Sequence, residues 1–182
     1  RRAIPGYRER IPSILVMMKE RLFSQGGAQV VGIFRLAPDK DECATIKAQL
    51  NAGTFEGVQD VNIMANLIKV WFREMPECLF DALPDSTIHR VADLPVRVSP
   101  HDLFGILCDI PSQLDQVPAE IERFPEPTRS LTEWLLDLMA EIVIHESVNK
   151  MNAKNMGTYI ACVLLSSHPD CVIFLGFSNR HV

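Results

Sequence analysis

The residues in this 182-residue chain that are best suited to chemistry are cations and an asparagine. Arg35 closes the segment Gly32 to Arg35 (GIFR), which follows Gln25 to Gly27 and precedes Pro38. Two apolar residues directly before Arg35 would pin the backbone, so that a loop between helices holds the always-charged guanidinium outward. A single loop arginine is more often a solvated charge, so its meaning depends on its neighbours.

Two further cations and one asparagine are candidates for the same site. Lys69 and Arg73 are four residues apart in a predicted helix and therefore lie on one face of it. Like charges at this spacing repel mildly, so stability alone gives no reason to pair them. Asn155 stands near the start of the last predicted helix. The ordinary interpretations are a solvated helix face for the cations and a local backbone hydrogen bond for Asn155.

Self-contained catalytic sites are not indicated. The chain has no nucleophile elbow, Walker glycine loop, H-E-x-x-H pair or dinucleotide fingerprint. Its histidines never fall at metal-ligand spacing, so we interpret them as surface or helix-end residues and predict no metal site. They are His89, His101, His145, His168 and His181. Carboxylate pairs such as Asp39 with Asp41 and Glu120 with Glu122 read as solvated helix turns and faces.

Composition limits the class of protein. With 47% hydrophobic residues the chain can bury one continuous core, and a net charge of -5 argues against a nucleic-acid footprint or a polybasic membrane patch. The five cysteines are widely spaced and form no C-x-x-C pair, so we expect reduced, mostly buried thiols in a cytoplasmic protein. No apolar run is long enough to span a bilayer. The chain begins without an initiator methionine, and we expect it to be a piece of a longer protein.

Hydrophobic periodicity predicts an all-α single domain of about eight or nine helices. Residues 1–10 are predicted to be an N-terminal extension and residues 11–182 the domain. The expected helices lie at about 11–23, 38–50, 61–75, 85–92, 100–108, 112–123, 127–143 and 152–164. Paired glycines at 26 and 27 should end the first helix, and Gly53 should end the second, because glycine readily takes the positive φ of a helix end.

Two of these helices have well-defined apolar faces. In the third, Ile63, Leu67, Val70 and Trp71 should line one side. The helix opened by Pro127 has a broader band, which implies a central, largely buried element. Its inward residues are predicted to be Leu131, Leu135, Leu138, Met139, Ile142 and Val143. Asn152 is placed to cap the last helix.

Three blocks of this chain together resemble the Rho GTPase-activating protein (RhoGAP) domain. They are Gly32 to Arg35, Leu67 to Glu77 (LIKVWFREMPE) and Asn149 to Asn155 (NKMNAKN), in family order at about family spacing. The resemblance covers roughly residues 11–166. Within the family, the first half is most similar to plant-type activators of Rop GTPases, because both the Gln-Gly-Gly and the Asn-x-Gly fit that sub-family.

The resemblance implies a role for each candidate. Arg35 matches the arginine finger that is inserted into the nucleotide pocket of a bound GTPase. Lys69 and Arg73 match the pair that supports the finger loop and contacts the GTPase, and Asn155 matches an asparagine that bonds across the interface and helps to orient it. The implied partner is a GTP-loaded Rho-family (Rho, Rac or Rop type) small GTPase. The domain would be no hydrolase itself and would have no cofactor, since GTP and magnesium belong to the partner.

Four positions depart from the family pattern and keep an alternative open. Cys162 and Val163 stand where the family has Pro-Asn, Val31 replaces an acidic residue, and Cys78 replaces a proline. These changes bear on helix packing and on docking of the partner. The alternative is a RhoGAP-like binding or scaffold module that docks a GTPase, or another signalling protein, without stimulating hydrolysis. An unrelated helical domain would require all three ordered matches to be accidental.

Overall fold

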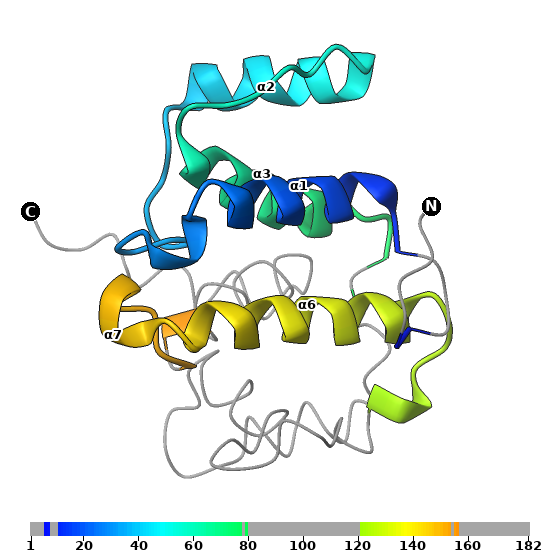
Figure 1. Ribbon diagram of the computed structural model, residues 1–182. Helices are drawn as coiled ribbons and strands as arrows, with labels where there is room; N and C mark the ends of the chain where they lie inside the picture. Colours follow the sequence, from blue (N-terminus) through cyan, green and yellow to red (C-terminus); the bar gives the residue numbers. More distant parts are fainter. Residues whose placement is uncertain (1–5, 8–10, 78, 80–120, 154, 157–182) are drawn as a thin grey trace, which may run out of the picture.

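A computed structural model describes residues 6–7, 11–77, 79, 121–153 and 155–156, and its regular elements are helices (Figure 1). In chain order they are α1 (Ser13–Ser24), the 3-10 helix η1 (Gly27–Gln29), α2 (Lys40–Ala52), α3 (Val61–Arg73), the 3-10 helix η3 (Ile121–Arg123), α6 (Thr128–Val143) and α7 (Glu146–Asn149). Helices α1 and α3 lie side by side, α2 covers them on one side, and α6 runs beneath them.

Several sequence predictions fall outside this described part. They include the helices expected at 85–92 and 100–108, most of those at 112–123 and 152–164, and the positions Cys78, Cys162 and Val163. The expected number of helices therefore stays a prediction. Among the described helices, none is long and apolar enough to cross a bilayer.

Helix α1 ends where the paired glycines predicted, but the two glycines act differently. Gly26 has a φ of 74°, the left-handed conformation that lets the chain turn away from the helix. Gly27 has no positive φ; a Cβ built on it would lie 2.6 Å from the carbonyl oxygen of Leu22. Gly27 therefore permits close approach of the chain to α1.

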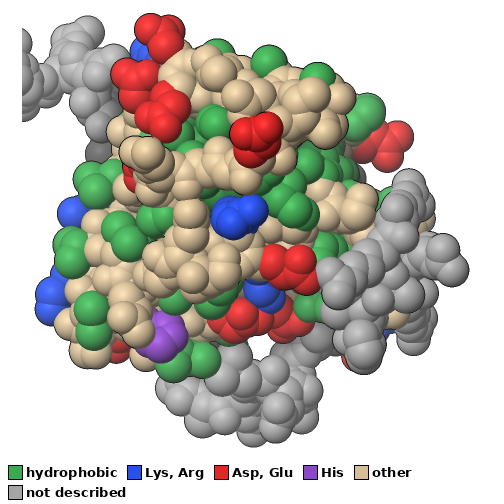
Figure 2. Space-filling model, turned by 45° about the horizontal axis from the view of Figure 1, so that its top comes forward, with side chains coloured by type: hydrophobic (Ala, Val, Ile, Leu, Met, Phe, Trp, Pro, Cys, Tyr) green, Lys and Arg blue, Asp and Glu red, His purple; other side chains and the backbone are tan. Residues whose placement is uncertain are grey.

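Helix α2 begins at Lys40, two residues later than predicted. The Asp39 carboxylate accepts hydrogen bonds from the backbone N–H groups of Asp41 (3.0 Å) and Glu42 (2.9 Å), so Asp39 is the N-cap. The placement of Pro38 in the first helical turn was wrong: Pro38 precedes the cap, because the cap supplies the acceptor for the free amides. Figure 2 shows acidic side chains gathered over this helix.

The far end of α2 agrees with the prediction. Gly53 caps it in the left-handed conformation, with a φ of 72°. Of the five cysteines, Cys43 on α2 is the one within the described residues, and it is a half-buried free thiol. Burial raises the pKa of this thiol, although the Asn66 amide at 3.5 Å from Sγ acts in the opposite direction.

Helix α3 buries a wider face than the sequence pattern indicated. Ile63 and Leu67 are buried as predicted, but Val70 and Trp71 are only half-buried. Phe72 is buried instead, with its ring centroid 6.2 Å from that of Trp134 on α6. The buried side chains of α3 are Val61, Ile63, Met64, Ala65, Leu67, Ile68 and Phe72.

Helix α6 is the central buried helix that the broad apolar band predicted. Of the six inward residues expected, five are buried and Val143 is half-buried. The short helix α7 that follows was not expected. It begins after His145, whose half-buried, helix-end position fits the interpretation of the histidines, and it ends at Lys150 with a φ of 61°.

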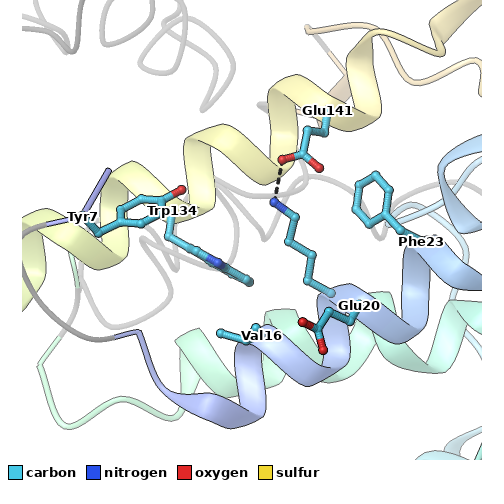
Figure 3. Close-up of a pocket in the computed structure, with 7 residues that line it drawn as sticks. Tyr7, Val16, Glu20, Phe23, Trp134 and Glu141 are labelled. Atoms are coloured by element: carbon cyan, nitrogen blue, oxygen red, sulfur yellow. Dashed lines mark hydrogen bonds and ion pairs between the residues drawn. The ribbon is translucent and has the colours of Figure 1, made fainter. Parts of the chain in front are cut away.

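Helices α1 and α6 face each other across a pocket of about 370 Å³ (Figure 3). Lys19 spans it, donating to Glu141 Oε1 at 2.6 Å, and its ammonium lies 5.7 Å and 5.9 Å from the ring centroids of Phe23 and Trp134. The pocket is lined by Tyr7, Val16, Lys19, Glu20, Phe23, Trp134 and Glu141. The Lys19 ammonium therefore joins α1 and α6.

The N-terminal segment reaches the same pocket through Tyr7, whose hydroxyl donates to Asp137 Oδ2. Burial raises the pKa of Tyr7 far above its ordinary value of 10.0, and the bond to Asp137 and the nearby carboxylates of Glu141 and Glu133 add to this effect. The folded state therefore keeps the Tyr7 proton at a pH where the unfolded chain loses it. Tyr7 stabilises the fold below about pH 10, and this contribution is lost as the pH rises further.

We therefore expect Tyr7→Phe to change the pH dependence of stability. Below about pH 10 the variant should be less stable by about 1 kcal/mol, the usual net value of one hydrogen bond. Above about pH 10 the difference should shrink, because phenylalanine cannot ionise in the unfolded chain. Urea unfolding of both proteins from about pH 8 to about pH 11 measures this. Parallel stability curves for the two proteins would contradict it.

Candidate functional site

The segment from Val30 to Leu36, here called the arginine loop, is a tight turn closed by its own backbone. Ile33 N–H donates to Val30 (3.1 Å), and the N–H groups of Arg35 (2.8 Å) and Leu36 (2.9 Å) both donate to the Gly32 carbonyl. Gly32 and Phe34 have positive φ values of 74° and 65°. Glycine adopts this conformation readily, whereas a phenylalanine must be held in it.

Burial of two side chains holds the loop, as the sequence predicted. Ile33 and Phe34 are 0% and 1% exposed, whereas Arg35 directly after them is exposed. The left-handed conformation costs an L-residue about 1–2 kcal/mol. Burying a phenylalanine side chain contributes about 1.5–3 kcal/mol, enough to offset that cost. The backbone that carries Arg35 is therefore set by the core.

The Arg35 guanidinium is available to another molecule. Within the described part of the chain it forms neither an ion pair nor a hydrogen bond. Its Nε and Nη2 lie 3.5 Å from the point where a Cβ on Gly32 would stand, and Leu36 Cγ lies 3.2 Å from that point. Because glycine has no side chain, the Arg35 guanidinium can lie close to the backbone at Gly32.

Lys69 and Arg73 share a face of α3 but differ in their surroundings. Lys69 is half-buried, and its Nζ donates to the Phe34 carbonyl oxygen at 2.7 Å. Arg73, one turn later, is the last residue of α3; its side chain is exposed and forms no ion pair or hydrogen bond with any other described residue. The structure therefore places Lys69 against the arginine loop and leaves Arg73 at the surface.

Asn155 is tied to the turn that precedes it. Its backbone N–H donates to Asn152 Oδ1 (2.8 Å), which is the bond expected of a helix cap at Asn152, and its Nδ2 donates to the Lys150 carbonyl (3.0 Å). This is the local backbone bond that the ordinary interpretation describes. The Asn155 Oδ1 atom has no protein partner in the described part of the chain.

Asn149 is the residue near this site that sequence reasoning missed. It is 0% exposed, and its backbone carbonyl accepts the Gly32 N–H at 2.8 Å. This bond joins the arginine loop to residues 144–149, here called the α6–α7 corner. The Lys150 carbonyl in turn accepts a hydrogen bond from Asn155. The available signal was that this asparagine opens the third motif block.

Exposed apolar side chains lie on the arginine loop and on the segment after α6 that is bonded to it. The large hydrophobic residues that are exposed in the described part are Val31 (53%), Leu36 (47%), Ile144 (71%) and Val148 (51%). Two belong to the arginine loop and two to the α6–α7 corner bonded to it. Along the left edge of Figure 2, the side on which this loop and α7 lie in Figure 1, hydrophobic and basic side chains alternate. Among the residues described, no group of three metal-ligating side chains occurs.

The fold and site define a class: an all-helical domain with an exposed arginine on a loop that is anchored in its core. The chain belongs to the RhoGAP domain family, whose model matches residues 12–169. The resemblance inferred from the three motif blocks is thus confirmed.

Relatives with curated descriptions agree with this assignment. Rho GTPase-activating protein gacA of Dictyostelium discoideum is 32% identical over 152 residues, covering 84% of this chain and 39% of that protein. Rho GTPase-activating proteins 1 and 2 of Arabidopsis thaliana are 35% and 36% identical over 152 residues, covering 83% of this chain and 28% and 30% of those proteins. The Arabidopsis matches agree with the predicted similarity to plant-type activators. The chain spans less than two fifths of the length of these relatives.

Solved structures confirm the all-α fold. The BH domain of GRAF, the GTPase regulator associated with focal adhesion kinase, superposes with a TM-score of 0.61 at 19% identity, covering 91% of this chain and 84% of that one. Human Rho GTPase activating protein 15 gives a TM-score of 0.54 at 17% identity, covering 87% of this chain and 82% of that one.

Proposed function

We propose that this domain binds a GTP-loaded Rho-family small GTPase and accelerates its GTP hydrolysis by donating Arg35 in trans. The observation that carries the proposal is the contrast within the arginine loop: Ile33 and Phe34 are buried, and Arg35 beside them is exposed and unpaired among the described residues. An arginine held this way can enter a partner's nucleotide site with little loss of conformational freedom.

The chemistry asked of Arg35 is electrostatic. As the γ-phosphoryl group is transferred, charge spreads over its oxygens and toward the leaving group, and a guanidinium placed there stabilises the transition state. This step needs no nucleophile or base from the activator. The attacking water, the residue that positions it, GTP and magnesium would all belong to the GTPase, so the domain is not itself a hydrolase and needs no cofactor.

The other site residues take supporting roles in this proposal. Lys69 braces the arginine loop from α3 through the Phe34 carbonyl. Arg73 and the free Oδ1 of Asn155 contact the partner. The exposed Val31 and Leu36 add apolar contact area beside the arginine.

We assign residues 11–182 to the domain and 1–10 to an extension, and we place the protein in the cytoplasm, with any membrane recruitment supplied by other parts of the parent protein.

The test is single-turnover GTP hydrolysis by a panel of Rho, Rac and Rop-type GTPases with increasing amounts of the domain. We expect saturable acceleration for at least one member.

The departures at Cys162 and Val163 favour a second candidate, a module that binds the GTP form without activating it. Binding to the GTP form with an unchanged hydrolysis rate throughout the panel would support that candidate and contradict activation.

Lys69→Met should lower the hydrolysis rate at saturation by about 10-fold to about 100-fold. A hydrogen bond to a charged group contributes about 1.5–3 kcal/mol, and its loss frees the carbonyl next to Arg35. The concentration for half-maximal rate should change less, because Lys69 is half-buried. The measurement is a titration of the domain against the responsive GTPase.

A matched control is Lys47→Met. Lys47 on α2 is paired at 2.6 Å with Glu74, which caps the end of α3, in an exposed ion pair that includes no residue of the arginine loop. Such pairs contribute little, so this variant should activate like the wild type. Equal rates for both lysine variants would show that the bond from Lys69 to Phe34 does not support the loop.

A further inference from the structure

The α6–α7 corner contains a fully buried asparagine whose polar atoms are all bonded. Asn149 is 0% exposed, and its two Nδ2 hydrogens go to the carbonyl oxygens of Ala28 (2.7 Å) and Ile142 (2.8 Å). Its Oδ1 accepts the Met151 N–H at 2.7 Å, and its backbone N–H donates to His145 at 3.0 Å. A buried polar group this completely bonded is rigid and specific to its place.

These bonds converge on the chain leading to Arg35. The Asn149 side chain donates to the Ala28 carbonyl, and its backbone carbonyl accepts the Gly32 N–H. The same side chain also donates to Ile142, so it joins this segment to the last turn of α6. Lys69 holds the same chain at Phe34 from α3. The arginine loop is therefore anchored from two helices at successive points, and the last anchor precedes Arg35 by one residue.

Substitutes of similar size but different chemistry cannot reproduce this arrangement. An amide offers two donors and an acceptor in one plane. A carboxylate would face the carbonyl oxygens of Ala28 and Ile142 with no donor, and a leucine of similar size would leave the Ala28 carbonyl and the Met151 N–H without a partner. The need for an amide thus comes from its bonds to Ala28, before the arginine loop, and to the chain at each end of the α6–α7 corner.

We infer that Asn149 is a positioning residue for Arg35: it fixes the position of the arginine loop relative to α6 and α7, and it does not contact the partner. This inference rests on the proposed function for its kinetic consequence. Its structural consequence, protection of the Gly32 amide, is independent of that function.

The experiment compares Asn149→Ala and Asn149→Ser with the wild type, each with Arg35 present and replaced by alanine. Serine can still accept the Met151 N–H but cannot reach Ala28 and Ile142, so it serves if the alanine variant folds poorly. With Arg35 present, we expect the saturating rate to fall about 10-fold or more while the half-maximal concentration changes less than about 3-fold. In the Arg35→Ala background the same change should have almost no further effect.

A control separates positioning from folding. Leu135→Ala removes a side chain that is 2% exposed in α6 and should destabilise the protein, yet it should keep the wild-type rate per folded molecule. Equal rate losses with and without Arg35, or an equal loss in Leu135→Ala, would overturn the inference, since Asn149 would then serve the fold alone.

Amide hydrogen exchange gives the second readout. In Asn149→Ala and Asn149→Ser, the Gly32 amide should exchange about 10-fold faster or more, relative to amides within α3, because its acceptor loses its fixed position. An unchanged Gly32 amide overturns the inference whatever the kinetics show. Faster exchange at Gly32 in a domain that activates no GTPase would support Asn149 as the anchor of the loop and reject the proposed function.

Discussion

Replacing Arg35 by alanine should remove about 10³-fold to 10⁵-fold of the hydrolysis rate at saturation, which is the range that an arginine supplied in trans contributes. The effect should fall on the rate and leave most of the binding, because the guanidinium interacts chiefly with charge that develops in the transition state. Single-turnover hydrolysis at saturating domain, with affinity for the GTP-bound partner measured separately, tests both parts.

Folding should not explain this loss. The Arg35 side chain is exposed and has no hydrogen-bond or ion-pair partner among the described residues, so its removal should change the free energy of unfolding by about 0.5 kcal/mol or less. Arg35→Lys keeps the charge but not the planar fork of donors and should recover only a small part of the rate. Arg73→Ala is the matched control at the exposed end of α3: it should raise the half-maximal concentration more than it lowers the saturating rate. If Arg35→Ala accelerates as well as the wild type, the arginine does not act in trans.

Truncating Phe34 should give the largest loss of stability among these changes. Phe34→Ala removes a side chain that is 1% exposed, and such changes typically cost about 3–5 kcal/mol. It should also release the arginine loop, so that the activation rate per folded molecule falls. Urea unfolding and the hydrolysis titration measure the two effects.

Phe34→Gly isolates the backbone part of this prediction. Phe34 has a φ of 65°, which alanine tolerates poorly and glycine tolerates well. The glycine variant should therefore be more stable than the alanine variant by about 1 kcal/mol, although it buries even less. In an ordinary helix or strand the order is the reverse. Finding alanine the more stable of the two would show that the left-handed conformation at Phe34 carries no cost.

The sequence was sufficient for features that depend on neighbours along the chain. It predicted the helix ends at the glycines, the inward band of α6, and the contrast between buried Ile33–Phe34 and exposed Arg35. Errors came where two local signals competed. Pro38 suggested the start of α2, but the carboxylate of Asp39 accepted the free amides and set the boundary.

The face of α3 shows the limit of periodicity. The pattern placed Trp71 inward, but Phe72 took the buried position beside Trp134 and left Trp71 half-buried. Both residues are apolar and adjacent, so spacing within one helix could not choose between them. The choice depended on where α6 lies.

By itself the sequence determined that the domain is helical, that it belongs with RhoGAP domains, and that Arg35 is its most informative residue. Only the tertiary structure decided how Arg35 is held. Lys69 reaches Phe34 across 35 positions, and Asn149 reaches Ala28 across 121. Side-chain spacing specifies a face of a helix, whereas a bond to a distant backbone carbonyl depends on which helices meet and at what height. The asparagine that anchors the loop therefore became visible only once α6, α7 and the arginine loop were seen together.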